Sequence, residues 1–119
     1  VAEWVRKYPV QLVAYSARTA SAVAARLAPA GIRTEPIDGL DYAQSCDELL
    51  GAISSQRLAH SGQDELTKQC LSAVKLPFGD GGWVMGRKVS NAVICGAVAS
   101  AMATHYATKA TDCVDIVIL

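Results

Sequence analysis

The chain has 119 residues, which suffice for one hydrophobic core but not for two, so we expect a single domain over residues 1–119. Its 51% hydrophobic and 18% charged residues are typical of a folded globular protein and exclude an intrinsically disordered chain. Eleven basic and eleven acidic residues cancel, so the overall charge gives no sign of a nucleic-acid-binding protein and leaves room only for a local basic patch.

The first third of the sequence predicts a β-α-β unit. Residues 1–8 resemble the end of a helix that Pro9 stops, which suggests an excerpt of a longer protein. Residues 10–15 read as a short buried strand, after which Ser16 caps a helix that ends near Gly31. Residues 32–37 form the second strand, and a crossover of this length predicts a parallel pair. The inward stripe of the helix is expected to be Ala20, Val23, Ala24 and Leu27.

Two further helices are expected in the middle of the chain. Asp41 can cap the first of them, and Ser61 with Asp64 forms a capping box for the second, which ends at residues 75–77. Residues 56–60 between them form a connector or a short strand. The inward residues of the first helix are expected to be Tyr42, Cys46, Leu49, Leu50 and Ile53, and those of the second Leu66, Cys70, Leu71 and Val74.

Residues 78–106 are predicted to form one packing unit of turn, strand, polar loop and closing helix. The glycine-rich residues 79–82 have turn chemistry, 83–87 alternate like a strand, and 88–91 form the loop. The helix is expected over residues 92–109, with small residues on several faces that let it pack close to a sheet. The tail, residues 110–119, ends in an apolar stretch that reads as a strand and needs a partner to avoid aggregation.

No feature of the sequence predicts export or membrane insertion. The longest apolar run, residues 92–103, is far shorter than the roughly twenty residues of a membrane span, and no signal-peptide pattern is visible at the start. We therefore expect no contact with a membrane and a location in the cytoplasm. Cys46, Cys70, Cys95 and Cys113 include no C-x-x-C pair, so reduced thiols are expected in preference to a zinc site or a disulfide framework.

Two catalytic interpretations follow from the residues alone. Ser16 lies where a strand end meets a helix start, the usual place for a site in an α/β sheet, and could act as a nucleophile with His60 or His105 as its base. The sequence lacks a G-x-S-x-G elbow, and serine is an ordinary helix cap at this position. The second interpretation is a magnesium site, although helix capping explains the same carboxylates, which are Asp38, Asp41, Asp47 and Glu48.

A third interpretation is phosphate binding by the glycine-rich turn. Residues 79–82 are followed by Arg87 and Lys88, which could contact a nucleic-acid backbone. The stretch has neither the P-loop pattern nor G-x-G-x-x-G before a helix, so a hairpin turn beside a solvated basic pair explains it equally well.

Several of these pieces, taken in order, resemble the C-terminal nuclease domain of the large terminase subunit of tailed bacteriophages. The matching stretches are VAYS at residues 13–16, RLAH at 57–60, KLPFGDGGW at 75–83 and the small-residue helix at 90–103. The resemblance implies an α/β, RNase H-like fold, a mixed sheet flanked by helices, whose first strands would precede residue 1. It also implies a bacterial host cytoplasm, double-stranded DNA and other packaging-motor or phage proteins as partners.

Terminase nucleases hold two divalent metals with three acidic residues. The resemblance places the second acid at Ser16 and the third at Val93, with Asn91 the nearest polar alternative, while the first would precede residue 1. Neither a hydroxyl nor an isopropyl group replaces a carboxylate on magnesium. The resemblance therefore implies vestigial positions and no catalysis, so that Mg²⁺ or Mn²⁺ would be needed only if a nuclease site still works.

We therefore expect a fragment or a degenerate, prophage-derived form of a terminase nuclease domain with a DNA-contact or protein-interaction role. Its expected backbone contacts are Lys75, Arg87 and Lys88, which flank the turn and loop. The alternative is a free-standing interaction module that forms a homo-oligomer through residues 114–119. A further alternative is an active nuclease with a relocated metal site at Asp38 or Asp41.

Overall fold

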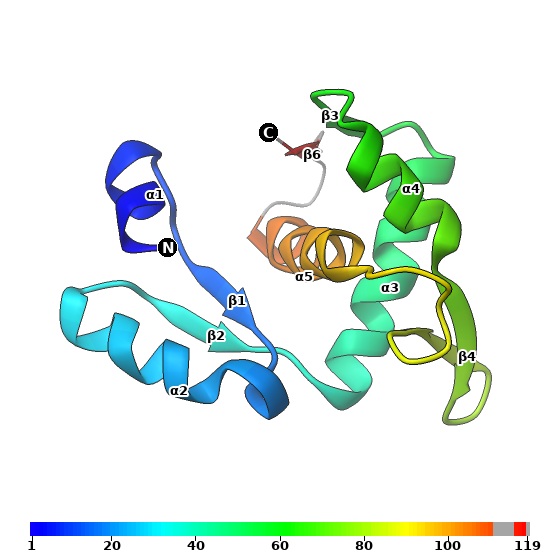
Figure 1. Ribbon diagram of the computed structural model, residues 1–119, viewed down its shortest axis with the longest axis horizontal. Coiled ribbons are helices and arrows are strands. Elements are labelled where there is room, and N and C mark those ends of the chain that lie inside the picture. Colours follow the sequence, from blue (N-terminus) through cyan, green and yellow to red (C-terminus); the bar gives the residue numbers. More distant parts are fainter. Residues whose placement is uncertain (111–115, 119) are drawn as a thin grey trace. The chain divides into compact units, whose positions relative to one another are not determined.

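The computed structural model describes residues 1–110 and 116–118. Contacts between residues group the chain into two compact units, Val1–Asp38 and Gly39–Leu119, which we call unit 1 and unit 2. Helices alternate with short strands throughout, and both parallel and antiparallel strand pairs occur, so the predicted α/β class is confirmed (Figure 1). The described strands pair two by two, in three two-stranded sheets. That the two units form one domain stays a prediction.

Unit 1 is the predicted β-α-β unit, preceded by a short helix. Strands β1 and β2 pair in parallel, with Val13 opposite Thr34 and Tyr15 opposite Pro36, and α2 crosses between them. Pro36 ends β2, where its missing N–H costs no ladder bond. The elements of this unit are α1 (Ala2–Lys7), β1 (Val13–Tyr15), α2 (Ala17–Leu27), the 3-10 turn η1 (Ala28–Ala30) and β2 (Thr34–Pro36).

The inward stripe expected for α2 is only partly correct. Ala24 is buried, whereas Val23 is 53% exposed, and Ala20 and Leu27 are half-buried. A sheet of two three-residue strands is too narrow to cover a whole helical stripe, so only its middle residue is enclosed.

Unit 2 contains the remaining helices, an antiparallel hairpin and a parallel strand pair. The hairpin joins β4 and β5, and the terminal strand β6 pairs in parallel with β3, with Leu58 opposite Ile116 and His60 opposite Ile118. The predicted terminal strand therefore has a partner within its own chain. The elements are α3 (Gly39–Ser54), β3 (Leu58–His60), α4 (Asp64–Ser72), β4 (Val74–Phe78), β5 (Gly82–Gly86), α5 (Cys95–Ala110) and β6 (Ile116–Ile118).

The core of unit 2 lies where α5 packs on α3 and where α3 packs on β5. Small side chains make the helix contact close, because Ala97 and Ala101 of α5 are completely buried, as are Ser45 and Ala52 of α3. Helix α5 was expected to pack close to a sheet. It packs mainly on α3, and its contact with a sheet is the smaller one with strand β6. The small side chains on the two contact faces let the helix backbones approach.

Three of the expected boundaries are wrong for identifiable reasons. Residues 75–77 belong to strand β4 and do not end a helix, because they pair with β5 across the hairpin. Asp41 lies within the first turn of α3, which begins at Gly39. Ser61 does not cap α4, because the helix begins later and its N-cap is Gln63. The Ser61 N–H instead donates to the Ile118 carbonyl and extends the β3–β6 ladder.

The expected inward faces of α3 and α4 also need correction. Cys46 and Leu49 are buried as predicted, but Leu50 and Ile53 are partly exposed, at 38% and 46%. On α4, Leu71 is 82% exposed and no residue is fully buried. The two helices leave apolar side chains exposed along their facing sides.

Two expectations from the sequence concern the cysteines, which were expected to be free thiols, and membrane insertion. Cys46, Cys70 and Cys95 are free thiols, of which Cys46 is buried and Cys95 is exposed, and Cys113 lies outside the described residues. Among the helices in residues 1–110, none combines the length and the apolar character that crossing a bilayer demands.

Candidate functional site

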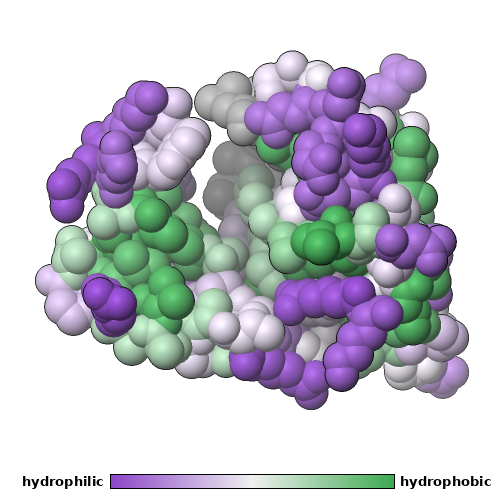
Figure 2. All heavy atoms as spheres, viewed as in Figure 1, coloured by the Kyte–Doolittle hydropathy of each residue, from purple (hydrophilic) through white to green (hydrophobic). Residues whose placement is uncertain are grey.

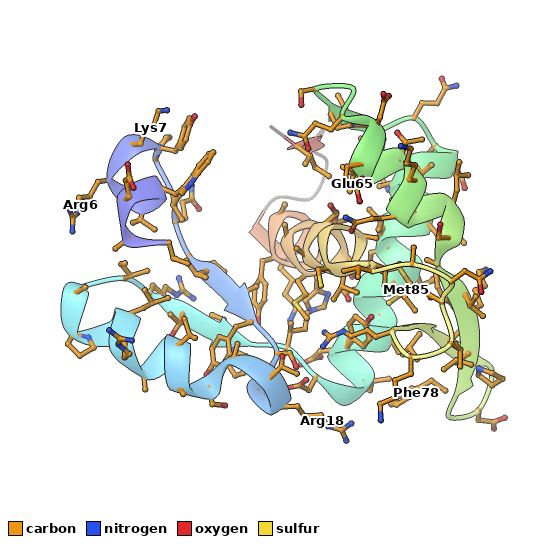
Figure 3. The ribbon with its side chains drawn as sticks, viewed as in Figure 1. Arg6, Lys7, Arg18, Glu65, Phe78 and Met85 are labelled. Atoms are coloured by element: carbon orange, nitrogen blue, oxygen red, sulfur yellow. The ribbon has the colours of Figure 1, made fainter. Side chains whose placement is uncertain are left out.

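The hairpin register places Lys75 and Trp83 on the same face. Lys75 lies opposite Met85 and Pro77 opposite Trp83, so Lys75 and Trp83 are diagonal neighbours across the two strands. The Lys75 ammonium nitrogen lies 4.2 Å from the centre of the Trp83 ring, within the range of a cation–π contact. Trp83 in turn donates from Nε1 to Asp47 Oδ1 of α3 at 3.3 Å. The ring therefore holds the ammonium of Lys75 on one face of the hairpin. Figure 3 labels Phe78 of β4 and Met85 of β5 on the two strands of this hairpin.

A second cation lies over an aromatic ring at the end of β5. The Arg87 guanidinium carbon is 5.9 Å from the centre of the Tyr42 ring of α3. The Tyr42 hydroxyl donates to the Met85 carbonyl at 3.0 Å, which fastens α3 to the hairpin. Burial raises the pKa of the Tyr42 hydroxyl well above its ordinary value, and the proximity of Cys46 raises it further while Arg87 opposes the change. Tyr42 therefore stays protonated and keeps its donor.

Hydrogen bonds from Ser90 fix the turn that follows β5. Ser90 Oγ donates to the Gly86 carbonyl at 2.6 Å and accepts the Val74 N–H at 3.1 Å, so it joins the turn to the start of β4. A side chain at Gly86 would meet Leu76 and Val89, so glycine is needed there. Arg87 and Lys88 follow Gly86 directly and are exposed in this turn.

The tip of the hairpin is a three-residue turn with glycine at its ends. Gly79 and Gly81 have φ values of 61° and 85°, in the left-handed region that glycine adopts without strain. The predicted turn is therefore confirmed. Asp80 lies between these glycines and is exposed, so the tip carries one negative charge.

The three residues predicted to contact a nucleic-acid backbone lie on one hairpin and the turn that follows it. Lys75, Arg87 and Lys88 are all exposed. Within residues 1–110 and 116–118, none of them has a carboxylate at ion-pair distance. Three exposed cations without acidic partners can contact the oxygens of a polyanion such as a phosphate backbone. Unit 1 also exposes cations, among them Arg6, Lys7 and Arg18, whose side chains Figure 3 labels.

In unit 1, Ser16 and Asp38 form a hydrogen-bonded pair at the start of α2. The Ser16 hydroxyl donates to Asp38 Oδ1 at 2.9 Å, and the Ala17 N–H donates to Asp38 Oδ2 at 2.7 Å. The predicted cap residue is correctly located, but the carboxylate of Asp38 does the capping and the Ser16 side chain does not. A negative charge at a helix start is favoured by the helix dipole, so the arrangement has a structural explanation.

The two histidines considered as bases for Ser16 are both engaged within unit 2. His60 Nδ1 accepts the Gly62 N–H at 3.1 Å, and His105 Nδ1 lies 2.8 Å from Glu48 Oε2. His105 is 1% exposed, and neither its Nε2 atom nor Thr104 Oγ1 has a hydrogen-bond partner among the described residues. The buried His105–Glu48 contact was missed by the sequence analysis, since no spacing pattern links residues so far apart.

The carboxylates considered as metal ligands either contact other groups of the protein or lie apart from further ligands. Both oxygens of Asp38 accept hydrogen bonds, Asp47 accepts one from Trp83, and Glu48 pairs with His105. Asp41 is exposed in the first turn of α3. In the part of the chain that the structure describes, no three His, Cys, Asp or Glu side chains lie close enough to hold a metal ion together.

The positions that the resemblance assigns to lost acids lie in different units. Ser16 belongs to unit 1 and is buried, whereas Val93 belongs to unit 2 and is 70% exposed. Val93 and Asn91 lie in the loop before α5, which begins at Cys95 and not at residue 92 as expected. The helix starts later because Gln69 Oε1 of α4 accepts the N–H groups of Gly96 and Ala97, at 2.6 and 3.3 Å, and so supplies its cap.

Comparison with known proteins adds no relative. No protein-family model matches the chain, and neither the curated proteins nor the solved structures gave a match.

Proposed function

We propose that the β4–β5 hairpin and the turn after it contact the phosphate backbone of double-stranded DNA. The observation that carries this proposal is the exposure of Lys75, Arg87 and Lys88 together, with no carboxylate at ion-pair distance within residues 1–110 and 116–118. Two of these cations lie over aromatic rings, which restricts their side chains before a phosphate arrives and lowers the entropy lost on binding. Contacts of this kind are independent of base sequence.

The wider proposal is that the chain is a fragment or a degenerate, prophage-derived form of a terminase nuclease domain. It would act in the cytoplasm of a bacterial host, beside other packaging-motor or phage proteins. No catalytic step is assigned to it, because Ser16 and Val93 stand where the resemblance places acids and neither can hold magnesium. A need for Mg²⁺ or Mn²⁺ would arise only from a relocated site at Asp38 or Asp41.

The proposal is tested by titrating the chain into a fluorescently labelled DNA duplex and following anisotropy at low salt. Arg87→Ala should weaken binding severalfold and equally on duplexes of unrelated sequence, because a backbone contact is lost. Lys7→Ala is the matched control, since Lys7 also lies over aromatic rings, those of Trp4 and Tyr8, but outside the hairpin. Equal loss in both variants would remove the hairpin from the proposal.

Incubating the same duplex with manganese distinguishes the nuclease alternative. If the positions of the lost acids are vestigial, the DNA should remain intact after prolonged incubation. Cleavage that requires manganese and is lost in Asp41→Asn would instead establish a relocated metal site.

A second candidate function is self-association through the terminal strand. One observation favours it: β6 and β3 form a sheet of only two short parallel strands, which is marginal by itself and leaves edges able to pair with another copy. Light scattering over a range of concentrations tests it. An oligomer that disappears when residues 114–119 are deleted would support this function.

A further inference from the structure

Two adjoining hollows follow one face of α3 in unit 2. The first encloses about 120 Å³ and is lined by Cys46, Trp83 and Met85 at one end. The second encloses about 320 Å³ and reaches Leu58 and Ile118 at the other end. Leu49, Ile53 and Cys70 line both hollows, so the two form one continuous depression between α3 and α4, which we call the α3 groove.

The lining of the α3 groove is mainly apolar, and part of it is exposed. Ile53 is 46% exposed and Leu71 of α4 is 82% exposed, although both were expected to face a core. An apolar ligand in the groove would be stabilised by covering these side chains. Figure 2 shows hydrophobic residues reaching the surface at the right-hand edge of the view, where β4 lies in Figure 1, and Val74 of that strand also lines the groove.

The length of the groove follows from the helix that forms its floor. Its floor follows one face of α3 from Cys46 to Ile53 and continues to Gln56 in the turn after the helix. The seven-residue step along the helix spans about 10 Å and the turn adds a few ångströms, so the floor matches the length of roughly ten to twelve carbons of an extended acyl chain.

Polar groups occur at both ends of the groove, and Thr67 and Ser100 also line the second hollow. Lys75 lines the first hollow, where its ammonium lies over Trp83 without an ion-pair partner among the described residues. Gln56 and His60 line the second hollow. Asp47 accepts a hydrogen bond from Nε1 at the edge of the Trp83 ring. An apolar channel with an exposed ammonium at one end matches an amphiphile with an anionic head.

We propose that the α3 groove binds a medium-chain fatty acyl carboxylate, with its chain along α3 and its carboxylate on the Lys75 ammonium. This ligand site shares Lys75 with the proposed DNA contact and otherwise uses other residues. Because ligand pockets combine an apolar lining with few polar groups, the carboxylate fixes the direction of the chain and the groove fixes its length.

The test uses the full chain carrying Trp4→Phe, in which Trp83 is the remaining tryptophan and reports on the groove. Saturated carboxylates of increasing length are titrated below their micelle concentrations while Trp83 fluorescence is recorded. Affinity should rise about fourfold for each added CH₂ group until the chain reaches roughly ten to twelve carbons, and then level off. An absence of saturable binding, or a steady rise beyond that length, would overturn the proposal.

Two variants locate the site and one serves as control. Ile53→Glu places a charge in the floor of the groove and should abolish binding of decanoate, whereas Leu40→Glu alters an exposed apolar residue of α3 outside the groove and should leave it unchanged. Lys75→Gln should weaken decanoate about two- to fivefold and leave decanol unaffected, as expected for one exposed ion pair.

Two further results would overturn the proposal that the groove binds a fatty acyl carboxylate. Equal affinity for decyltrimethylammonium would refute recognition of a carboxylate, and a concentration-dependent dimer that Ile53→Glu dissolves would show that a second copy covers the groove. Loss of decanoate binding in Ile53→Glu with DNA affinity intact would separate this proposal from the proposed function, so each can fail alone.

Discussion

Replacing Gln69 should loosen the closing helix, because one oxygen of this side chain caps α5. Gln69 Oε1 accepts from the N–H groups of Gly96 and Ala97, which otherwise have no partner in the preceding turn. A neutral hydrogen bond contributes about 1 kcal/mol, and losing an N-cap side chain costs about 0.5–2 kcal/mol. Gln69→Ala should therefore destabilise the protein by about 1–2 kcal/mol, or about 4–8 °C in Tm for a chain of this size.

Thermal unfolding followed by circular dichroism at a helical wavelength measures this effect. Gln69→Glu retains an acceptor oxygen and adds a negative charge at the helix start, but it loses the Nε2 donor to Glu65 and brings two carboxylates together, so its Tm should lie between those of Gln69→Ala and the parent chain. Gln44→Ala is the control, since Gln44 is an exposed glutamine on α3. A Tm for Gln69→Ala equal to that of the parent, or a loss equal to that of Gln44→Ala, would refute the capping role.

Three further changes test other parts of the account. Gly82→Ala would bring the new Cβ to 2.6 Å from the Phe78 carbonyl oxygen across the turn, so it should lower the free energy of unfolding by about 1–3 kcal/mol. An unchanged midpoint in chemical denaturation would contradict this close approach. Asp80→Asn removes the negative charge at the hairpin tip and should tighten DNA binding about twofold at low salt, whereas weaker binding would argue against a phosphate contact there. Burial raises the pKa of the Cys46 and Cys70 thiols, so iodoacetamide at pH 8 should label Cys95 before either of them, as peptide mass spectrometry can check.

Local patterns in the sequence predicted local structure well. The β-α-β unit follows from Pro9, the capping position at Ser16 and two short apolar stretches, and the glycines at 79 and 81 specify the hairpin tip. In these places one or two residues restrict the backbone whatever the rest of the chain does.

The sequence did not predict local structure that depends on a contact with a residue far along the chain. Residues 75–77 look like a helix end until β5 is known to pair with them, and the start of α5 depends on Gln69, which no capping pattern near residue 92 reveals. The aromatic supports of the candidate site were missed for the same reason. Trp83 holds Lys75 through the register of a hairpin, and Tyr42 reaches Arg87 from another element. The exposed side of the α3 groove was misread as core, because helical periodicity marks an apolar face without saying what covers it.

The salt dependence of DNA binding tests the central claim most directly. If Lys75, Arg87 and Lys88 each displace a counterion from the backbone, the plot of log affinity against log salt should have a slope of about −2 to −3 for the parent chain. Changing all three residues to glutamine should bring that slope close to zero, while Lys68→Gln on α4 should leave it unchanged. A slope that survives the triple change would contradict a backbone contact through the hairpin.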